Sequence, residues 1–266
     1  MPRSSEAQGI GARKRFEGKV VLITGATSGI GETTAMAFAR EGAKVAFCGR
    51  RKERGLEVEK AIIKAGGQAK FFQADVTNEK QMSDFVNGTV SHFGRIDVAF
   101  NNAGTGNFDF KPPIELSLND FENTFKTNVA GVFISMKFQI PVMIKQGGGV
   151  ILNMASLNGH RSTKYQVAYS ASKAAVVSLS ATTALAYGKQ GIRINSLSPG
   201  TVNTETVEKV TKGLASAGVK ASAKNALDRY LTEEEVAKTV LSVCSDDGSS
   251  IYATDIDLSF GEMALI

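Results

Sequence analysis

Short apolar segments alternate with helical segments along the chain from residue 19 onward, and this alternation limits the fold more than any other feature of the sequence. The first apolar segment, residues 19–24 (KVVLIT), runs directly into glycines, which is typical of a strand buried on both faces of a parallel sheet. Strands separated by helices pair in parallel through right-handed crossovers and form an open sheet with helices on both faces. Because ligands of such sheets bind at the carboxyl ends of the strands, functional residues are expected there.

The later segments continue the pattern and predict seven strands in all. Apolar, β-branched or aromatic runs predict further strands over residues 44–48, 69–73, 96–101, 149–154, 193–197 and 255–258, and helical periodicity predicts helices over residues 31–41, 52–65, 79–93, 118–145 and 168–188. Thr232 and Glu235 form a T-x-x-E capping box, so the acidic run at residues 233–235 indicates a helix N-terminus and not a metal site. We expect one doubly wound α/β domain over residues 17–266.

Composition excludes several classes of protein. With 42% hydrophobic and 21% charged residues, a chain of 266 residues can bury a large core without disulfides or structural metals. Its two cysteines, Cys48 and Cys244, show no C-x-x-C spacing, and its two histidines, His92 and His160, do not supply a histidine-rich metal site. We therefore predict no metal site and a reducing, cytoplasmic environment.

The net charge of +5 arises partly from a basic leader, residues 1–16, which contains Arg3, Arg13, Lys14 and Arg15. Such a leader can touch nucleic acid or lipid headgroups, but a short basic tail is more commonly solvated. No apolar run reaches the roughly 18 to 20 residues that cross a membrane, and the N-terminus lacks the apolar segment of a secretory signal. We expect a flexible leader, and neither a nucleic-acid nor a membrane partner.

A glycine-rich turn from Thr24 to Gly31 (TGATSGIG) joins the first strand to the first helix. Glycines let the backbone turn tightly and approach a pyrophosphate, whose charge is favoured by the free N–H groups of a helix N-terminus. The spacing G-x-x-x-G-x-G departs from the G-x-G-x-x-G dinucleotide fingerprint. An ordinary strand-to-helix connection would also explain the glycines, but their position within a strand–helix–strand unit favours a nucleotide site.

Tyr169 and Lys173 stand four residues apart, which places both side chains on one face of a helix. A phenol, with an ordinary pKa of about 10, is a poor base at neutral pH, but a neighbouring ammonium favours its ionised form and lowers that pKa. The pair is therefore able to move a proton near neutral pH. Taken alone, a surface tyrosine beside a solvated lysine would be the simpler interpretation.

In combination, the motifs of this chain resemble those of the short-chain dehydrogenase/reductase family, in its short single-domain form. The matching elements, in chain order, are the T-G-x-x-x-G-x-G turn, Asp75-Val76, Asn101-Asn102-Ala103-Gly104, Asn128, Ser156, Tyr169-x-x-x-Lys173, Asn195 and Pro199-Gly200. Each motif alone is loose, but all of them in this order and spacing are highly specific. The resemblance extends from Thr24 to Gly261 and implies a Rossmann-like fold.

The resemblance implies four catalytic residues. Ser156 would donate a hydrogen bond to the substrate carbonyl oxygen, where negative charge develops. Tyr169 would donate a proton to that oxygen in reduction, or remove it from an alcohol in oxidation. Lys173 would hold the nicotinamide ribose and lower the pKa of the tyrosine, and Asn128 would anchor a water that links Lys173 to solvent.

The resemblance also implies a nicotinamide dinucleotide site, in which the cofactor supplies the hydride chemistry. The expected residues are Gly25, Ser28, Gly29, Ile30 and Gly31 at the phosphates, Asp75 and Val76 at the adenine, Asn102, Ala103 and Gly104 beside the adenosine ribose, Tyr169 and Lys173 beside the nicotinamide, and Pro199, Gly200, Val202 and Thr204 near the carboxamide. Glycines and asparagines at these places also form turns, and both roles are compatible.

The end of the second strand indicates which dinucleotide is preferred. An NAD site has an acidic side chain there, which binds the ribose 2′-hydroxyl and repels a 2′-phosphate. This chain has Gly49 at that position, followed by Arg50 and Arg51, and the first acidic residue afterwards is Glu53. Guanidinium groups without a repelling carboxylate favour NADP. The glycine-rich turn itself adds no basic residue, so NAD remains the alternative.

These observations predict an NADP-dependent carbonyl reductase or alcohol dehydrogenase that acts on a small ketone or secondary alcohol. The alternative is a non-catalytic dinucleotide-binding sensor or scaffold, although a sensor needs none of Ser156, Tyr169 and Lys173. Similar proteins are commonly homotetramers, and the apolar tail at residues 263–266 suits docking on the core or on a neighbouring subunit.

The substrate itself is not identified by the sequence. The expected walls of its pocket are residues 105–110, residues 157–166 and a lid segment at residues 203–229. These stretches contain the basic residues His160, Arg161, Lys164, Lys209 and Lys212. Their charges would suit an anionic ketone if they were free, whereas solvated side chains would select nothing.

Overall fold

The expected strands form one parallel sheet in the computed structural model, which describes residues 14–106, 112–161, 164–205, 207–208 and 225–265. Within those residues the strand order is β3-β2-β1-β4-β5-β6-β7, and every neighbouring pair is parallel. The strands are β1 (Val20–Thr24), β2 (Lys44–Gly49), β3 (Gln68–Gln73), β4 (Val98–Asn101), β5 (Gly149–Met154), β6 (Ile192–Pro199) and β7 (Asp255–Leu258). The winding reverses between β1 and β4, which brings the functional motifs to one edge of the sheet.

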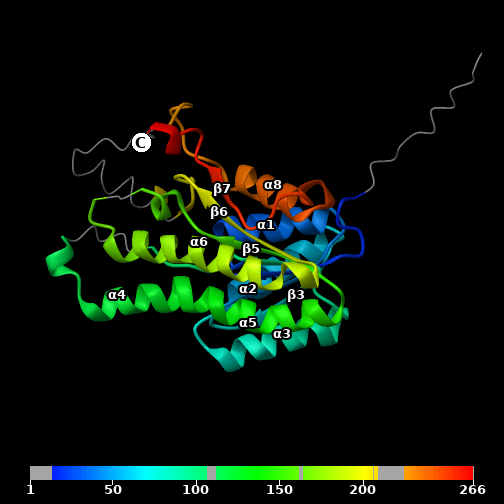
Figure 1. Ribbon diagram of the computed structural model, residues 1–266. Coiled ribbons are helices and arrows are strands. Elements are labelled where there is room, and N and C mark those ends of the chain that lie inside the picture. The colour runs from blue at the N-terminus through cyan, green and yellow to red at the C-terminus, as the bar shows by residue number, and fades with distance from the viewer. Residues whose placement is uncertain (1–13, 107–111, 162–163, 206, 209–224, 266) are drawn as a thin grey trace, which may run out of the picture.

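Helices cover both faces of this sheet (Figure 1). They are α1 (Gly29–Arg40), α2 (Lys52–Lys64), α3 (Glu79–Phe93), α4 (Leu118–Phe125), α5 (Gly131–Lys145), α6 (Val167–Tyr187) and α8 (Glu233–Cys244). Side chains of α1, α2 and α8 pack on one face, and side chains of α3, α5 and α6 pack on the other.

Successive side chains of a strand point to opposite faces of the sheet, so each central strand contributes to the hydrophobic core on both faces. In β1, Val21 and Ile23 point into the core beneath α1, α2 and α8, while Leu22 points into the core beneath α3, α5 and α6. Since both faces of the central strands are covered, an uninterrupted apolar run is what this position requires. The seven-stranded, doubly wound Rossmann-like fold expected from the sequence is confirmed.

The start of the domain differs from the expectation. Residues 1–13 of the expected leader lie outside the described residues, but Phe16 is only 2% exposed and packs edge-on against Phe38, with ring centroids 4.8 Å apart. The Arg15 guanidinium also pairs with Glu41 at 2.9 Å. Assigning Phe16 to the leader is therefore wrong, because an aromatic side chain at the end of a basic stretch is needed to close the core.

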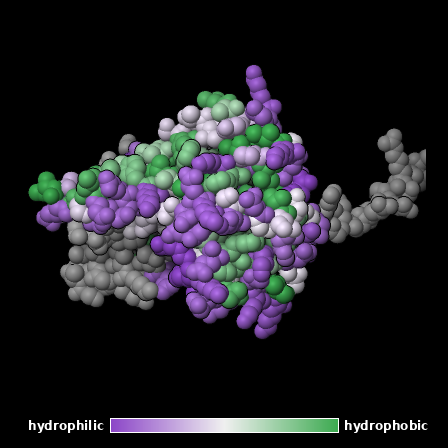
Figure 2. Space-filling view, turned by 90° about the horizontal axis from the view of Figure 1, so that it is seen from below, coloured by the Kyte–Doolittle hydropathy of each residue, from purple (hydrophilic) through white to green (hydrophobic). Residues whose placement is uncertain are grey.

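One long helix contains a markedly apolar stretch. Residues Leu118–Lys145 run continuously through α4, a π-helical turn at Lys126–Ala130, and α5, and an 18-residue window of this helix has a mean hydropathy of 1.3. By length and composition such a helix is able to cross a membrane, but half of that window is buried inside the protein, as in a core helix. The face seen from below in Figure 2 is mainly hydrophilic, with smaller hydrophobic areas between.

The two cysteines are buried and unpaired. Burial raises the pKa of the Cys48 thiol and of the Cys244 thiol to about 12. Both groups are therefore thiols, not thiolates, near neutral pH, and they pack as small apolar side chains.

Candidate active site

The glycine-rich turn leaves β1 and enters α1 along a path that only glycine permits. Gly25 has φ +70°, and a Cβ atom there would lie 2.7 Å from Cα of Ala103. A Cβ atom on Gly31 would lie 2.7 Å from Nδ2 of Asn102. Ser28 is the N-cap of α1, but its side chain does not cap the helix, so the N–H groups of the first turn are left for another acceptor.

The end of β2 meets this turn from the side. Gly49 packs against Thr27, so that a Cβ atom at residue 49 would lie 2.6 Å from Cγ2 of Thr27. Arg51 extends over the turn, and its Nη2 donates to the hydroxyls of Thr27 at 3.0 Å and Ser28 at 2.5 Å. Arg50 and Arg51 are both exposed, but Arg50 contacts its surroundings through its backbone, where the carbonyl oxygen accepts from Gln73. Arg51 is thus the better placed of the two guanidinium groups.

The residues after β3 and β4 complete the wall of the dinucleotide site. The Asp75 carboxylate accepts from the backbone N–H and the hydroxyl of Thr77, and the Val76 side chain is buried under Gly131. After β4, Asn102 donates to the carbonyl oxygens of Thr24 and Gly25 at 3.2 and 3.1 Å. These contacts join the ends of β1 and β4, the two strands at which the winding reverses.

Tyr169, Lys173 and Ser156 come together at the carboxyl end of β5. Lys173 is 4% exposed, its Nζ donates to the carbonyl oxygen of Met154 at 2.8 Å, and it lies 5.7 Å from the ring centroid of Tyr169. Ser156 is buried at the start of a short 3-10 turn, where its Oγ accepts from the N–H of Asn158 at 3.2 Å. A side-chain hydrogen bond connects Ser156 with Tyr169.

The protonation of this cluster is governed by burial. Burial lowers the pKa of Lys173 to about 8 and raises the pKa of Tyr169, while the hydrogen bond with Ser156 acts in the opposite direction on the tyrosine. The sequence predicted a lowering of the tyrosine pKa by Lys173, whereas the main influence on it is desolvation, which raises it. A phenol with a raised pKa keeps its proton at neutral pH, which suits a proton donor.

Asn128 lies in the π-helical turn between α4 and α5 and is fully buried. Its Oδ1 accepts from the N–H of Thr105 at 2.8 Å, and its Nδ2 donates to Thr105 O at 2.9 Å and to Ser172 Oγ at 3.0 Å. Gly104 lies between, since a Cβ atom there would be 3.3 Å from Asn128 Oδ1 and 3.5 Å from Lys173 Nζ. A single π turn inside an α-helix is frequent at functional sites, and this one carries Asn128, whose side chain contacts Thr105 and Ser172.

The segment after β6 closes the site on its far side. The N–H of Gly200 donates to the carbonyl oxygen of Leu258 at 2.9 Å, and Val202 pairs with Leu231 in a parallel bridge. Thr204 accepts from the N–H of Val207 through its hydroxyl. Residues 206 and 209–224 of the expected lid lie outside the described residues, as do residues 107–110 and 162–163 of the expected pocket walls.

Two of the cations expected near the substrate are paired with carboxylates. His160 Nε2 lies 2.7 Å from Asp255 Oδ2, and Arg161 forms an ion pair with Glu262. Lys164 lies over the ring of Tyr165, 5.0 Å from its centroid. The pairing partners, about a hundred residues away in sequence, carry no local signal.

Sequence analysis also missed Ser172 and Glu233. The Ser172 hydroxyl donates to the carbonyl oxygen of Tyr169 at 2.7 Å while accepting from Asn128, and its place directly before Lys173 was the available signal. The Glu233 carboxylate accepts from Thr33 at 2.8 Å and would lie 3.6 Å from a Cβ atom on Gly29. Burial raises the pKa of Glu233. The capping box located its helix but not this contact with the glycine-rich turn.

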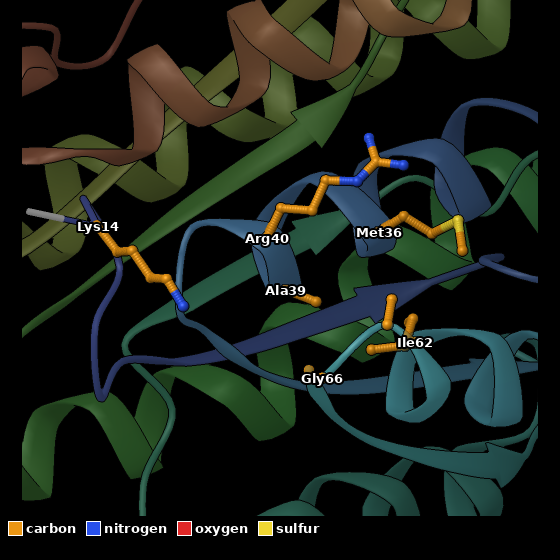
Figure 3. Close-up of a pocket in the computed structure, with 8 residues that line it drawn as sticks. Lys14, Met36, Ala39, Arg40, Ile62 and Gly66 are labelled. Atoms are coloured by element: carbon orange, nitrogen blue, oxygen red, sulfur yellow. The ribbon is translucent and has the colours of Figure 1, made fainter. Parts of the chain in front are cut away.

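A separate pocket lies between the end of α1 and the end of α2 (Figure 3). Met36, Ala39 and Ile62 form its apolar part, and Lys14 and Arg40 stand at its rim. Both helices end at the amino-terminal edge of the strands, so this pocket is remote from the cluster of Ser156, Tyr169 and Lys173. Within the described residues, no group of three or more His, Cys, Asp and Glu side chains is arranged to hold a metal ion.

The sequence matches a family model that describes this arrangement. The model for short chain dehydrogenases aligns with residues 19–215, which contain the glycine-rich turn, Asn128, Ser156, Tyr169 and Lys173. The chain belongs to the short-chain dehydrogenase family. It is therefore an oxidoreductase of a family that uses nicotinamide cofactors.

Individual relatives match over nearly their whole length. Levodione reductase of Leifsonia aquatica is 36% identical over 94% of this chain and 96% of its own, and a levodione reductase crystal structure superimposes with a TM-score of 0.88, at 34% identity, over 94% of this chain and 100% of that one. Secoisolariciresinol dehydrogenase of Forsythia intermedia is 36% identical over 93% and 90% of the two chains. A 7α-hydroxysteroid dehydrogenase, solved with NADH and 7-oxo glycochenodeoxycholic acid, superimposes with a TM-score of 0.86, at 29% identity, over 94% and 96% of the two chains.

The buried Lys173 predicts a pH-dependent stability. Its pKa falls from 10.5 to about 8 on folding, so between these values the unfolded chain binds a proton that the folded chain lacks. The stability of the wild type should therefore rise between pH 8 and 10.5, relative to a Lys173→Met variant that cannot titrate there. Urea unfolding at pH 7 and pH 10 should show a change on the order of 2 kcal/mol in the difference between the two proteins. Lys137→Met, at an exposed lysine of α5, is the control, and a pH-independent difference for Lys173→Met would contradict the buried ammonium.

Proposed function

We propose that this protein is an NADP-dependent carbonyl reductase or alcohol dehydrogenase acting on a small ketone or secondary alcohol. The observation that supports this most directly is the cluster at the end of β5, in which Tyr169 bonds to Ser156 while Lys173 lies 5.7 Å from its ring. A tyrosine, a serine and a lysine arranged in this way are suited to donate a proton to a carbonyl oxygen.

The proton chemistry follows from the positions of the side chains. Ser156 and Tyr169 both offer hydroxyl hydrogens, so a carbonyl oxygen between them would be stabilised as negative charge develops on it. Tyr169, whose raised pKa keeps it protonated, gives its proton to that oxygen in reduction, and regains it from the alcohol in the reverse direction. Lys173 would orient the ribose of the cofactor. Asn128 holds the backbone of Thr105 and would anchor a water that links Lys173 to solvent.

The dinucleotide site fits a nicotinamide cofactor. Gly25 and Gly31 leave room that a Cβ atom would fill, and the uncapped first turn of α1 offers N–H groups to a pyrophosphate. We assign the phosphates to Gly25, Ser28, Gly29, Ile30 and Gly31, the adenine to Asp75 and Val76, the adenosine ribose to Asn102, Ala103 and Gly104, and the carboxamide to Pro199, Gly200, Val202 and Thr204. The bound nicotinamide supplies or accepts the hydride.

The preference for NADP is supported by two features of the β2 end. Gly49 presents no carboxylate, and Thr27 fills the space that a side chain at residue 49 would occupy. Arg51 is held over the turn by two hydroxyls, so its guanidinium is partly ordered before a 2′-phosphate arrives, and Arg50 adds a second positive charge.

We also propose a cytoplasmic homotetramer. Large apolar side chains are exposed on the helices that cover one face of the sheet, among them Leu118 in α4, Phe133 in α5 and Leu185 in α6, the last 78% exposed. Large apolar side chains exposed on several helices of one face favour association with another copy. Sedimentation velocity should report about four times the 28.2 kDa chain mass, and a monomer at micromolar concentration would contradict the proposal.

Replacing the proton donor tests the proposed reaction. Tyr169→Phe removes only the hydroxyl, so we expect kcat for ketone reduction to fall by about 100- to 10,000-fold while NADPH binds with nearly unchanged Kd. The assay follows nicotinamide absorbance over a panel that includes cyclohexanone and ethyl acetoacetate. Tyr187→Phe, at the opposite end of α6, is the matched control. Unchanged turnover in Tyr169→Phe would remove this residue from the reaction.

A second substitution tests the preference for NADP. Arg51→Ala should weaken NADPH binding by about 10- to 100-fold, because a charge-assisted bond to the 2′-phosphate is lost, and should change NADH binding far less. Titrations that follow the emission of the reduced nucleotide give both Kd values. Arg54→Ala, an exposed arginine of the same helix paired with Glu32 and Glu57, should leave the ratio of the two Kd values unchanged. Equal effects of Arg51→Ala on both nucleotides would favour NAD.

A further inference from the structure

The turn near the end of the described chain, Ser259–Met263, contacts three segments that surround the candidate active site. We call it the C-terminal turn. Its backbone closes on itself, because the N–H of Glu262 donates to the carbonyl oxygen of Ser259 and the N–H of Met263 donates to the Ser259 hydroxyl. A turn ordered in this way is able to hold other segments in fixed positions.

The first contact is the ion pair between Glu262 and Arg161. The Glu262 carboxylate is almost fully buried, with 6% of its side chain exposed against 28% for Arg161. A carboxylate is rarely buried unless it is paired, so the buried Glu262 carboxylate needs the Arg161 guanidinium beside it. The pair joins residues 101 positions apart in the sequence.

Arg161 is in turn close to the proposed catalytic residues. Its backbone N–H and that of His160 donate to the carbonyl oxygen of Leu157, in the short turn that Ser156 begins. That turn lies directly on α6, since a Cβ atom on Gly159 would be 2.9 Å from the backbone of Lys173. A displacement of Arg161 would therefore be passed to the turn that sets the position of Ser156.

The second and third contacts lie on the other sides of the C-terminal turn. A Cβ atom on Gly200 would be 3.4 Å from Oε2 of Glu262, so the carboxylate also lies against the segment after β6. The carbonyl oxygen of Phe260 accepts from the N–H of Ala226. The aromatic ring of Phe260 has its centroid 4.6 Å from the guanidinium carbon of Arg229. The end of the proposed lid segment is anchored there.

Two local features of this region work against stability. Phe260 has φ +54°, a conformation that a bulky side chain rarely adopts. The Nε–H of Arg161 is buried, and within the described residues it has no hydrogen-bond partner. Unfavourable backbone angles and unpaired buried polar groups are found at functional sites more than elsewhere.

We propose that Glu262 is a positioning residue, which acts through Arg161 to fix Ser156 relative to the segment at Gly200. This inference rests on the proposed carbonyl reduction, since Ser156 matters there as a donor to the carbonyl oxygen. The C-terminal turn thus sets the distance between the donors on the substrate side and the wall of the cofactor site.

The test is Glu262→Gln, which keeps the shape of the side chain and removes its charge. We expect kcat/KM for the ketone to fall by about 10- to 100-fold, because small misplacements of a donor to the carbonyl are costly. The Kd for NADPH should change less than about threefold, and the pH profile of kcat should keep its shape, because Tyr169 and Lys173 are untouched. Glu41→Gln breaks the Arg15–Glu41 pair at the opposite edge of the sheet and is the matched control.

A double variant separates positioning from stability. Arg161→Met combined with Glu262→Gln leaves no unpaired buried charge, so its thermal midpoint should recover toward that of the wild type. Its kcat/KM should stay low, because the link between the C-terminal turn and the Ser156 turn is missing. Recovery of kcat/KM together with the thermal midpoint would show a purely structural role and overturn the proposal.

Hydrogen exchange on the full chain gives a readout that needs no substrate. The amides of residues 157–161 should exchange faster in Glu262→Gln than in the wild type, and should be unaffected in Glu41→Gln. Unchanged exchange in that segment would refute the link itself. If the wild type reduced no carbonyl compound while exchange still responded to Glu262→Gln, the proposed function would fail and the link would stand.

Discussion

The hydrogen bond from the Lys173 ammonium to the carbonyl oxygen of Met154 connects α6 to the carboxyl end of β5. A buried ammonium is costly unless it is bonded, so this contact is required once the lysine is inside the protein. Ser156 follows Met154 by two residues, and Tyr169 lies one helical turn before Lys173. One interaction therefore sets the place of a helix, a strand end and two hydroxyl groups relative to one another.

The same burial decides the protonation of the cluster. Both Lys173 and Tyr169 lose solvent, and desolvation disfavours the charged form of each, so the pKa of the lysine falls and that of the tyrosine rises. Sequence spacing predicts that the two side chains meet, and it does so correctly. It does not predict how much water remains around them, and it is this loss of water that raises the pKa of Tyr169.

What could be predicted from the sequence is what depends on neighbours along the chain. The apolar run of β1, the periodicity of α3 and the capping box of α8 each specify their own element, and the structure shows them at or within a residue or two of the expected bounds. Parallel pairing then brings the strand ends together, so the glycine-rich turn, Asn102 and Ser156 were placed at the correct edge. The proposed roles of these residues stay predictions.

What could not be predicted depends on contacts between distant residues. The partners of His160 and Arg161 are 95 and 101 residues away, and no local pattern links them. The π turn around Asn128 has no sequence signature that distinguishes it from the surrounding helix. Phe16 was assigned to the leader because its neighbours are basic, although its own side chain closes the core.

The contact between Gly49 and Thr27 limits which substitutions these two positions accept during evolution. A side chain at residue 49 would meet Cγ2 of Thr27, so any larger residue there requires Thr27 to rotate or to become smaller. The two positions are thus sterically coupled, and a substitution at residue 49 is easier to accommodate once residue 27 has changed.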